Sequence, residues 1–380
     1  MAGPLHGIEV VELAGLGAAP FCAMVLADLG AEVVRVDRAD QVVGEHTRST
    51  RHDLHNRGKQ SIGVDLKHSD GVEVVLRLVD RSEVLIEGFR PGVAERLGIG
   101  PEVCLERNPR LVYGRMTGWG QDGPLAGRAG HDIDYIALSG ALHGIGPERS
   151  PVPPLNLVGD FGGGGMLLAV GILAAVLSAR ETGAGQVVDA AMVDGSALLT
   201  TSIHGFIAEG MWTAKREANL LDGGAPFYSV YETSDGGHIA IGALEPQFYS
   251  ALLGALGIPE ESLPEPGDRA AWPRIREVLA ARFLDATRDE WAVRLSDLDA
   301  CVAPVLSALE APINPHNRDR GVFVEVDGVI QPAPAPRFSA TPSDSPPGPS
   351  FPGRDTDRVL QSLGFSQGEV SKLRQVEAVA

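Results

Sequence analysis

Two titratable side chains, His131 and Asp160, lie in glycine-containing stretches that are otherwise too apolar to need them. Histidine and aspartate move protons near neutral pH when a site holds them in a partly desolvated place. The pair therefore predicts a device for proton transfer. Each residue also has an ordinary structural interpretation, because a histidine can be a hydrogen-bonded core residue and an aspartate is a preferred helix N-cap.

The stretch Gly15–Pro20 resembles part of a dinucleotide-binding turn, with Asp37 at the place of the acid that binds ribose. The match is incomplete, because Pro20 stands where the third glycine belongs and Arg38 follows the acid. We interpret the stretch as a tight strand-to-helix turn. A nicotinamide-dependent oxidoreductase is an alternative that NAD titration would test.

Basic residues recur where predicted strands and helices end, namely Arg38, Lys67, Arg90 and Arg96. Each alone is an ordinary solvated surface charge. The carboxyl ends of parallel strands meet at one edge of a sheet, which is where phosphate-bearing ligands bind. As a set, the four cations predict a local basic pocket for such a ligand.

Strand-like and helical segments alternate in the first part of the chain. Strands are predicted at Gly7–Leu13, Glu32–Asp37, Glu83–Ile86 and Arg110–Arg115, and helices at Pro20–Leu29, Gly71–Arg81 and Pro101–Arg107. This alternation is typical of an α/β fold with a parallel, doubly wound sheet.

After Asp160 the pattern changes to longer helices and then to a smaller α+β unit. Helices are predicted at Gly164–Ala179, Ala190–Met211, Pro246–Leu256, Trp272–Phe283 and Arg288–Leu295, a strand at Gln186–Asp189, and a hairpin from Phe227–Thr233 and His238–Gly242. The proline- and serine-rich stretch 340–353 is predicted to be an extended loop before a terminal helix.

The composition is that of an ordinary globular protein, with 380 residues of which 44% are hydrophobic and 22% charged. This length suggests two domains. The formal net charge of -18 opposes nonspecific binding to nucleic acid or to an anionic membrane, because the field repels phosphate. The uncharged run Phe161–Ala179 approaches the length of a membrane span, but its glycines and the preceding Asp160 favour a buried core helix.

Three cysteines, Cys22, Cys104 and Cys301, are far apart and form no CxxC pair, which indicates a reducing compartment. No secretory signal is visible near the amino terminus, so we predict a cytoplasmic protein. No histidine and carboxylate cluster has metal-ligand spacing, and we expect no metal.

Taken together, these motifs resemble the class III CoA-transferase superfamily (CaiB/BaiF type) and, within it, the 2-methylacyl-CoA racemases. The segments that carry the resemblance run in family order: Gly7–Leu13, Asp28–Val34, Asn56–Lys59, Arg90–Gly92, Met116–Gln121, Gly130–Asp132, Gly159–Asp160 and Gly242–Gln247. No single segment is diagnostic, but the ordered set is specific.

The resemblance implies an α/β fold with a Rossmann-like large domain and a smaller α+β domain. The large domain would comprise residues 1–185 and be completed by 325–380, linker helices would occupy 186–225, and the small domain 226–324. The resemblance also implies that the linkers wrap two chains into an interlocked homodimer.

Position by position, the resemblance implies that His131 and Asp160 are the catalytic pair and that Glu245 is the acid that contacts the histidine. It assigns CoA binding to Arg38, Val64, Asp65, Leu66, Lys67, Gly88, Phe89, Arg90, Arg96, Gly130, His131, Asp132, Ile133, Asp134 and Tyr135. The partner is an acyl-CoA thioester, and no separate cofactor is expected because CoA is part of the substrate. The stretch Gln41–His55 fits the family poorly, so the contacts to adenine and to the 3′-phosphate stay open.

Racemising the carbon next to a thioester requires one group that removes a proton from one face and another that returns a proton on the other face. With ordinary pKa values of about 6.5 and about 3.9, histidine and aspartate supply one acceptor and one donor near neutrality if the site raises the pKa of the aspartate. Amides of the glycine-rich run after Asp160 are expected to stabilise the enolate oxygen. The predicted activity is therefore that of an isomerase acting on 2-methylacyl-CoA.

Other activities remain open. In a CoA transferase, Asp160 would attack the thioester and carry the acyl group covalently. His131 and Glu245 favour the racemase, because covalent transfer through one carboxylate needs no second base at that position. A noncatalytic CoA-binding protein is a further alternative. The acyl group is not specified, because apolar residues such as Leu220, Leu221 and Phe227 fit an acyl surface and core packing equally well.

Overall fold

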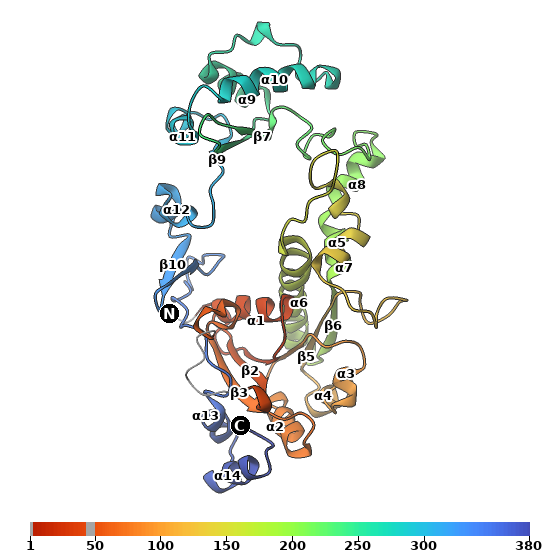
Figure 1. Cartoon of the computed structure of the whole chain (residues 1–380). Helices are drawn as coiled ribbons and strands as arrows, with labels where there is room; N and C mark the ends of the chain where they lie inside the picture. The colour runs from red at the N-terminus through yellow and green to blue at the C-terminus, as the bar shows by residue number, and fades with distance from the viewer. Residues whose placement is uncertain (1–2, 43–49) are drawn as a thin grey trace. The chain divides into compact units, whose positions relative to one another are not determined.

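The structure is a computed structural model that describes residues 3–42 and 50–380. The chain divides into two compact units (Figure 1). The first unit contains the residues up to Ser139, Leu155–Leu199 and His316–Ala380, and the second contains Gly140–Pro154 and Thr200–Pro315. Each unit has its own apolar core.

The first unit is built on a six-stranded sheet in which all neighbouring strands are parallel. The order is β3-β2-β1-β4-β5-β6, with β1 at Glu9–Leu13, β2 at Glu32–Arg38, β3 at Lys59–Val64, β4 at Val84–Glu87, β5 at Val112–Thr117 and β6 at Gln186–Ala191. This is the order of doubly wound dinucleotide-binding folds, whose winding direction changes between β1 and β4. The predicted α/β fold with a parallel sheet is confirmed.

Helices cover both faces of this sheet, and the side chains of consecutive strand residues point to opposite faces. Val10 faces the core under α1 (Ala18–Asp28) and α6 (Leu167–Thr182), whereas Val11 faces the opposite core. The helices over that opposite core are α2 (Ser69–Val79), α4 (Pro101–Arg107), α13 (Thr356–Ser362) and α14 (Gln367–Gln375).

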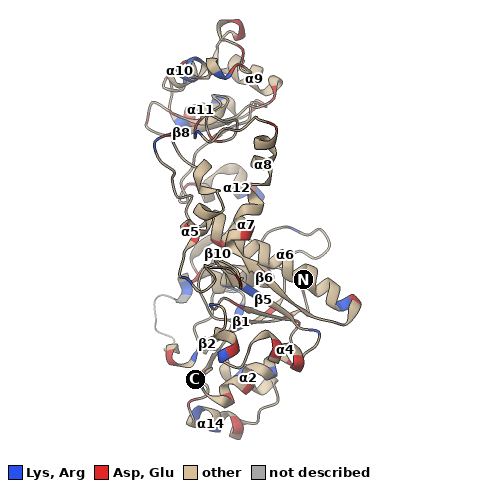
Figure 2. Ribbon diagram, turned by 90° about the vertical axis from the view of Figure 1, so that its right-hand side faces the viewer, with Lys and Arg blue, Asp and Glu red and all other residues tan. Residues whose placement is uncertain are grey.

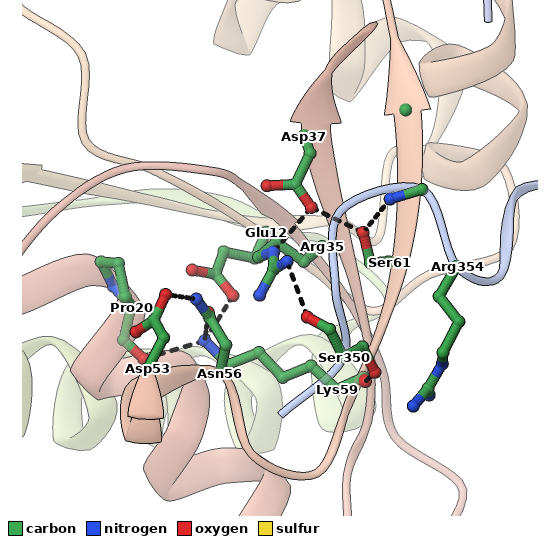
Figure 3. A network of polar contacts seen from close by, with 12 residues as sticks. Glu12, Pro20, Arg35, Asp37, Asp53, Asn56, Lys59, Ser61, Ser350 and Arg354 are labelled. Atoms are coloured by element: carbon green, nitrogen blue, oxygen red, sulfur yellow. Dashed lines mark hydrogen bonds and ion pairs between the residues drawn. The ribbon is translucent and has the colours of Figure 1, made fainter. Parts of the chain in front are cut away.

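The edge strand β3 was not predicted from the sequence, because its first three residues, Lys59, Gln60 and Ser61, are polar. Lys59 and Ser61 are nevertheless buried. Figure 3 shows the reason: the ammonium group of Lys59 donates to Oε2 of Glu12 at 2.6 Å and to the carbonyl of Pro20 at 3.0 Å. Because Pro20 is in the first turn of α1, the hydrogen bond from Lys59 to its carbonyl also ties α1 to the sheet.

The carboxyl-terminal part of the chain returns to the same edge of the sheet. The hydroxyl of Ser350 donates to the carbonyl of Lys59 at 2.5 Å, and the amide of Ser61 donates to Oδ2 of Asp355 at 2.9 Å. Val379 forms a bridge with Val64. These contacts cover an edge whose backbone groups would otherwise be open to another strand.

Asp160 lies within a continuous helical stretch made of a π-helix (Leu157–Met166) followed by α6. The glycines of this stretch allow close packing. A Cβ on Gly163 would lie 2.6 Å from the amide nitrogen of Ser196, and one on Gly165 would lie 2.7 Å from the carbonyl of Ala18. The glycine run therefore has a packing cause, in addition to any role in a site.

This stretch, Leu157–Thr182, is long and apolar enough to cross a membrane by length and composition alone. Its side chains Leu168 and Ile172 are buried, at 0% and 1% exposure, in the core that α6 forms with the sheet. The predicted core helix is therefore present, although its start differs from the predicted Gly164.

The single helix predicted at Ala190–Met211 is wrong. β6 continues to Ala191, which pairs with Thr117 of β5, and two short helices follow, α7 (Met192–Leu199) and α8 (Thr201–Ala208). Pairing with the neighbouring strand overrides the helical tendency of the alanines in Asp189–Ala191. α5 (Asp132–Leu138) was also missed.

The second unit contains the antiparallel sheet β7-β8-β9, with β7 at Tyr228–Glu232, β8 at His238–Gly242 and β9 at Val302–Pro304. Three helices share its core: α9 (Pro246–Leu256), α10 (Trp272–Phe283) and α11 (Arg288–Leu295). The predicted hairpin and the three predicted helices are confirmed. The remaining elements of the chain include α3 (Val93–Arg96), α12 (Pro315–Arg320), β10 (Phe323–Val326) and β11 (Val329–Pro332).

Candidate active site

A cavity of about 620 Å³ lies at the carboxyl edge of the parallel sheet. It is lined by residues at the ends of β1, β2 and β3, by Phe89 after β4, and by the carboxyl-terminal segment from Arg374 to Ala380. Ligands of doubly wound sheets bind at this edge, close to the point where the winding direction changes. The cavity therefore has the position of a nucleotide-binding pocket.

Several predicted CoA contacts line this cavity: Arg38, Val64, Asp65, Leu66, Lys67 and Phe89. Its apolar walls include Leu13, Val36 and Val379, which suit a flat base, while Arg38 and Lys67 supply positive charge. Arg38 pairs with Asp40 in an exposed ion pair, and Asp37, Asp40 and Asp65 also line the cavity, so its charge is mixed.

The predicted segment Gly88–Arg90 follows β4, and a buried ion pair holds its start. Oε2 of Glu87 accepts a hydrogen bond from the amide of Phe89 at 2.6 Å, and its Oε1 accepts one from Nε of Arg115 at 2.9 Å. The guanidinium of Arg115 also reaches Glu95 in α3, the helix that carries the predicted contact Arg96. One arginine thus links two predicted CoA-binding segments.

His131 immediately precedes α5 as its N-cap residue, and its side chain is exposed. The amide of His131 donates to Oδ2 of Asp134 at 2.9 Å, and the hydroxyl of Tyr135 donates to the carbonyl of Gly130 at 2.5 Å. Burial, followed by the negative charge of Asp160, raises the pKa of Tyr135 to about 12. The predicted segment Gly130–Tyr135 is therefore a fixed turn at a helix start that leaves the imidazole accessible.

Asp160 is half-buried and is not a helix N-cap, which corrects that structural interpretation: Asn156 has the N-cap position of the π-helix. The side-chain amide of Asn156 donates to Oδ2 of Asp160 at 3.3 Å. The backbone amide of Asp160 donates to Oδ2 of Asp132 at 2.7 Å. One hydrogen bond at its side chain and one at its backbone amide therefore hold Asp160 in place.

Burial is the largest effect on the pKa of Asp160 and raises it above its ordinary value. The negative charge of Asp132 raises this pKa further, while the hydrogen bond from Asn156 and the charges of His131 and His55 lower it. Because Asp132, which directly follows His131, accepts the hydrogen bond from the amide of Asp160, the structure brings the segments of the two predicted catalytic residues together. The raised pKa is the condition that two-base proton transfer sets for the aspartate.

Glu245 is in the second unit, where it is the exposed N-cap of α9, followed by Pro246 in the first turn. Its carbonyl accepts hydrogen bonds from the amides of Phe248 and Tyr249, at 3.0 Å each. These contacts fix its backbone and leave its carboxylate on the surface. Its contact with a histidine stays a prediction.

Three site residues were not singled out as such from the sequence. Asn156 contacts Asp160 directly and could have been found from its spacing, because residues i and i+4 of a helix share a face. Gly17 approaches Asp160 from a remote part of the chain. His55 lies in a cluster with Phe21 and Phe161, with ring centroids 5.9 and 5.3 Å from its own. No local pattern connects these two residues with Asp160.

Within the described ranges 3–42 and 50–380, no group of three or more histidine, cysteine, aspartate or glutamate residues is arranged to hold a metal ion. Cys22 and Cys104 are buried free thiols, and Cys301 is an exposed one. Burial raises the pKa of Cys22 far above the range in which a thiolate forms.

Comparison with known proteins adds independent information. The sequence model of CoA-transferase family III matches residues 5–356. The alpha-methylacyl-CoA racemases of Mus musculus and Homo sapiens are 46% and 45% identical, each over 97% of this chain and 96% of the relative. A crystal structure of a CaiB/BaiF family protein from Brucella suis superposes with a TM-score of 0.82 at 25% identity, covering 96% of this chain and 100% of that one.

Proposed function

Because the chain belongs to CoA-transferase family III, with racemases among its relatives, we propose that it interconverts (2R)- and (2S)-2-methylacyl-CoA thioesters. The protein is then an isomerase that acts on acyl-CoA. The observation that carries the proposal is the half-buried Asp160, whose backbone amide donates to Asp132, the residue next to His131, so that the carboxyl and the imidazole belong to one site. A single nucleophilic carboxylate would not require that second base.

In the proposed reaction, a neutral imidazole of His131 removes the α-proton from one face of the substrate, and the C–H electron pair becomes part of an enolate. The protonated carboxyl of Asp160 then delivers a proton to the opposite face, and the enolate electrons form the new C–H bond. The reverse direction exchanges the two roles. The sum of the two steps inverts the carbon without net gain or loss of atoms or electrons, so the reaction needs no separate cofactor.

The cavity at the sheet edge supports CoA as the part of the substrate that the protein binds. Arg38 and Lys67 lie there beside apolar walls, the combination that a nucleotide with phosphate groups requires. We assign the segments Val64–Lys67, Gly88–Arg90 and Gly130–Tyr135, together with Arg96, to CoA and to the thioester. Glu245 is proposed to orient His131, as the resemblance implies.

We further propose a cytoplasmic homodimer. Along the outer face of the helical stretch at Leu157–Thr182, Met166, Val170 and Leu177 are 46%, 63% and 69% exposed in the single chain. Figure 2 shows that α6 carries charge only towards its end, where Arg180 and Glu181 lie. An uncharged apolar face of this kind supports burial against a second copy. Light scattering of the purified protein tests the dimer.

The second candidate is CoA transfer through a covalent intermediate on Asp160, which the name of the family itself motivates. In that reaction the carboxylate of Asp160 attacks the thioester, and the α-proton is not involved. The two functions are therefore separated by exchange at the α-carbon.

The deciding experiment follows deuterium uptake and optical purity of single-enantiomer 2-methyldecanoyl-CoA in heavy water. We expect the wild-type protein to incorporate deuterium and to lose optical purity. Asp160→Asn and His131→Ala should abolish the exchange or restrict it to one enantiomer. A wild-type protein without exchange, and with a trapped acyl or CoA adduct on Asp160, would instead establish transfer.

A further inference from the structure

Asp132 is almost completely buried, at 6% exposure, although it follows the exposed His131 directly. Its Oδ2 accepts the hydrogen bond from the amide of Asp160 at 2.7 Å. Its Oδ1 is buried without a hydrogen-bond partner among the described residues. A buried carboxylate that makes only one hydrogen bond lowers the stability of the fold, so its presence at this position requires a reason.

The surroundings leave little room for Asp132 to move. A Cβ added to Gly159 would lie 2.5 Å from Oδ2 of Asp132 and 3.2 Å from a methyl group of Ile136. Only glycine therefore fits at position 159 while Asp132 keeps its place. The π-helix that carries Asp160 and the helix that begins after His131 meet at this contact.

Among the described residues, three charged or titratable groups change the pKa of Asp160, and the charge of Asp160 in turn acts on Tyr135. Asp132 and His131 come from the start of α5, and His55 comes from the short helix Leu54–Asn56. Asn156 adds a neutral hydrogen bond. Asp132 is the one group among these that favours the neutral carboxyl, since both histidines and Asn156 favour the carboxylate.

We propose that Asp132 is a positioning residue for Asp160. Its carboxylate holds the backbone amide of Asp160 and places a fixed negative charge beside the carboxyl group of Asp160. Its side chain acts through Asp160 and not on the substrate. The backbone of Asp132 keeps the place in the CoA-binding segment that the resemblance implies. The inference deepens the proposed function, because a proton donor is needed at Asp160 only if the α-carbon is racemised.

Two substitutions separate the two actions of the side chain. Asp132→Asn removes the charge and keeps an oxygen that can accept the hydrogen bond, whereas Asp132→Ala removes both. Because the loss of the negative charge lowers the pKa of Asp160, the pH profile of kcat/KM for α-proton exchange should move to lower pH in Asp132→Asn, with little change in KM. Asp132→Ala should in addition lose roughly tenfold to a hundredfold in kcat, as expected for a misplaced catalytic group.

Asp355→Asn is the matched control. Asp355 is also 6% exposed and also accepts a backbone amide, that of Ser61 at 2.9 Å, but it is not among the groups that act on Asp160. We expect this variant to lose stability without any shift of the pH profile. A purely structural role of Asp132 would give the same result as the control, and an unshifted profile in Asp132→Asn would overturn the proposal.

A second readout does not depend on catalysis. In protein that contains aspartate labelled with ¹³C at the carboxyl carbon, the Asp160 signal is assigned as the one missing from Asp160→Asn, and its titration is followed by NMR. The signal should titrate at lower pH in Asp132→Asn than in the wild type. If the Asp160 titration shifts in Asp132→Asn but the wild-type protein shows no α-proton exchange, the proposed function alone is overturned. If the wild-type protein shows exchange but the titration does not shift, the role of Asp132 alone is overturned.

Discussion

The carboxylate of Asp160 lies against the backbone of Gly17, such that a Cβ on Gly17 would be 3.3 Å from Oδ2 of Asp160. Gly17 precedes α1 and has φ 71° and ψ -119°, a conformation open to glycine and costly for other residues. The glycine turn that resembles a dinucleotide motif is therefore one wall of the proposed proton-transfer site.

Gly17→Ala should lower kcat for α-proton exchange by roughly tenfold to a hundredfold, because the added methyl group displaces the carboxylate of Asp160. Gly7→Ala is the control, since Gly7 also has positive φ, 82°, but an added Cβ would have no neighbour within 4 Å. Both variants should lose similar stability in urea denaturation. Equal loss of activity in the two variants would show that backbone strain alone is responsible.

Arg38→Ala should weaken the binding of CoA by about tenfold or more, since a hydrogen bond between charged groups contributes about 1.5–3 kcal/mol. Isothermal titration calorimetry at two salt concentrations measures this loss, which should shrink at high salt. Arg318→Ala removes an arginine from another exposed ion pair, with Asp319 at 3.5 Å, and should leave the affinity unchanged. An unaltered Kd in Arg38→Ala would place the CoA phosphates elsewhere.

Lys59→Met should destabilise the protein by about 3–5 kcal/mol, because it leaves the carboxylate of Glu12 buried and unpaired. Burial alone raises the pKa of Glu12 and lowers that of Lys59, so each charge depends on the other. The double variant Glu12→Gln/Lys59→Met should recover most of this loss in urea denaturation. Additive losses from the two substitutions would contradict the coupling.

Asp355 should stabilise the fold at neutral pH and less so in acid. Burial opposes its charge, but hydrogen bonds from Ser61, Arg358 and Arg354 together lower its pKa below the usual value. A carboxyl group whose pKa is lower in the folded state stabilises the fold at pH values above its unfolded pKa of about 3.9. This stabilisation disappears as the pH falls through the pKa of the folded state. The difference in unfolding free energy between wild type and Asp355→Asn should thus be constant above about pH 5 and shrink below about pH 4. A difference that grows in acid would show that the sign is wrong.

The periodicity of the sequence was sufficient for the parallel sheet and for most of its helices, because buried strands and amphipathic helices leave patterns along the chain itself. It failed at Lys59–Val64, where the polar residues of a strand are buried by partners from β1, α1 and the carboxyl-terminal segment. It also failed at Ala190–Met211, where pairing with β5 extends a strand that local propensity assigns to a helix. Both errors come from contacts between distant segments.

The sequence by itself singled out His131 and Asp160 as candidates, since a titratable residue beside glycine is visible without a structure. Only the tertiary structure decided which groups surround them. Asp132 and Gly17 meet Asp160 because α5, the π-helix and the turn before α1 converge at the carboxyl edge of the sheet. The pKa of a carboxyl group depends on burial and on charges a few ångströms away in space, and these are properties of the folded chain.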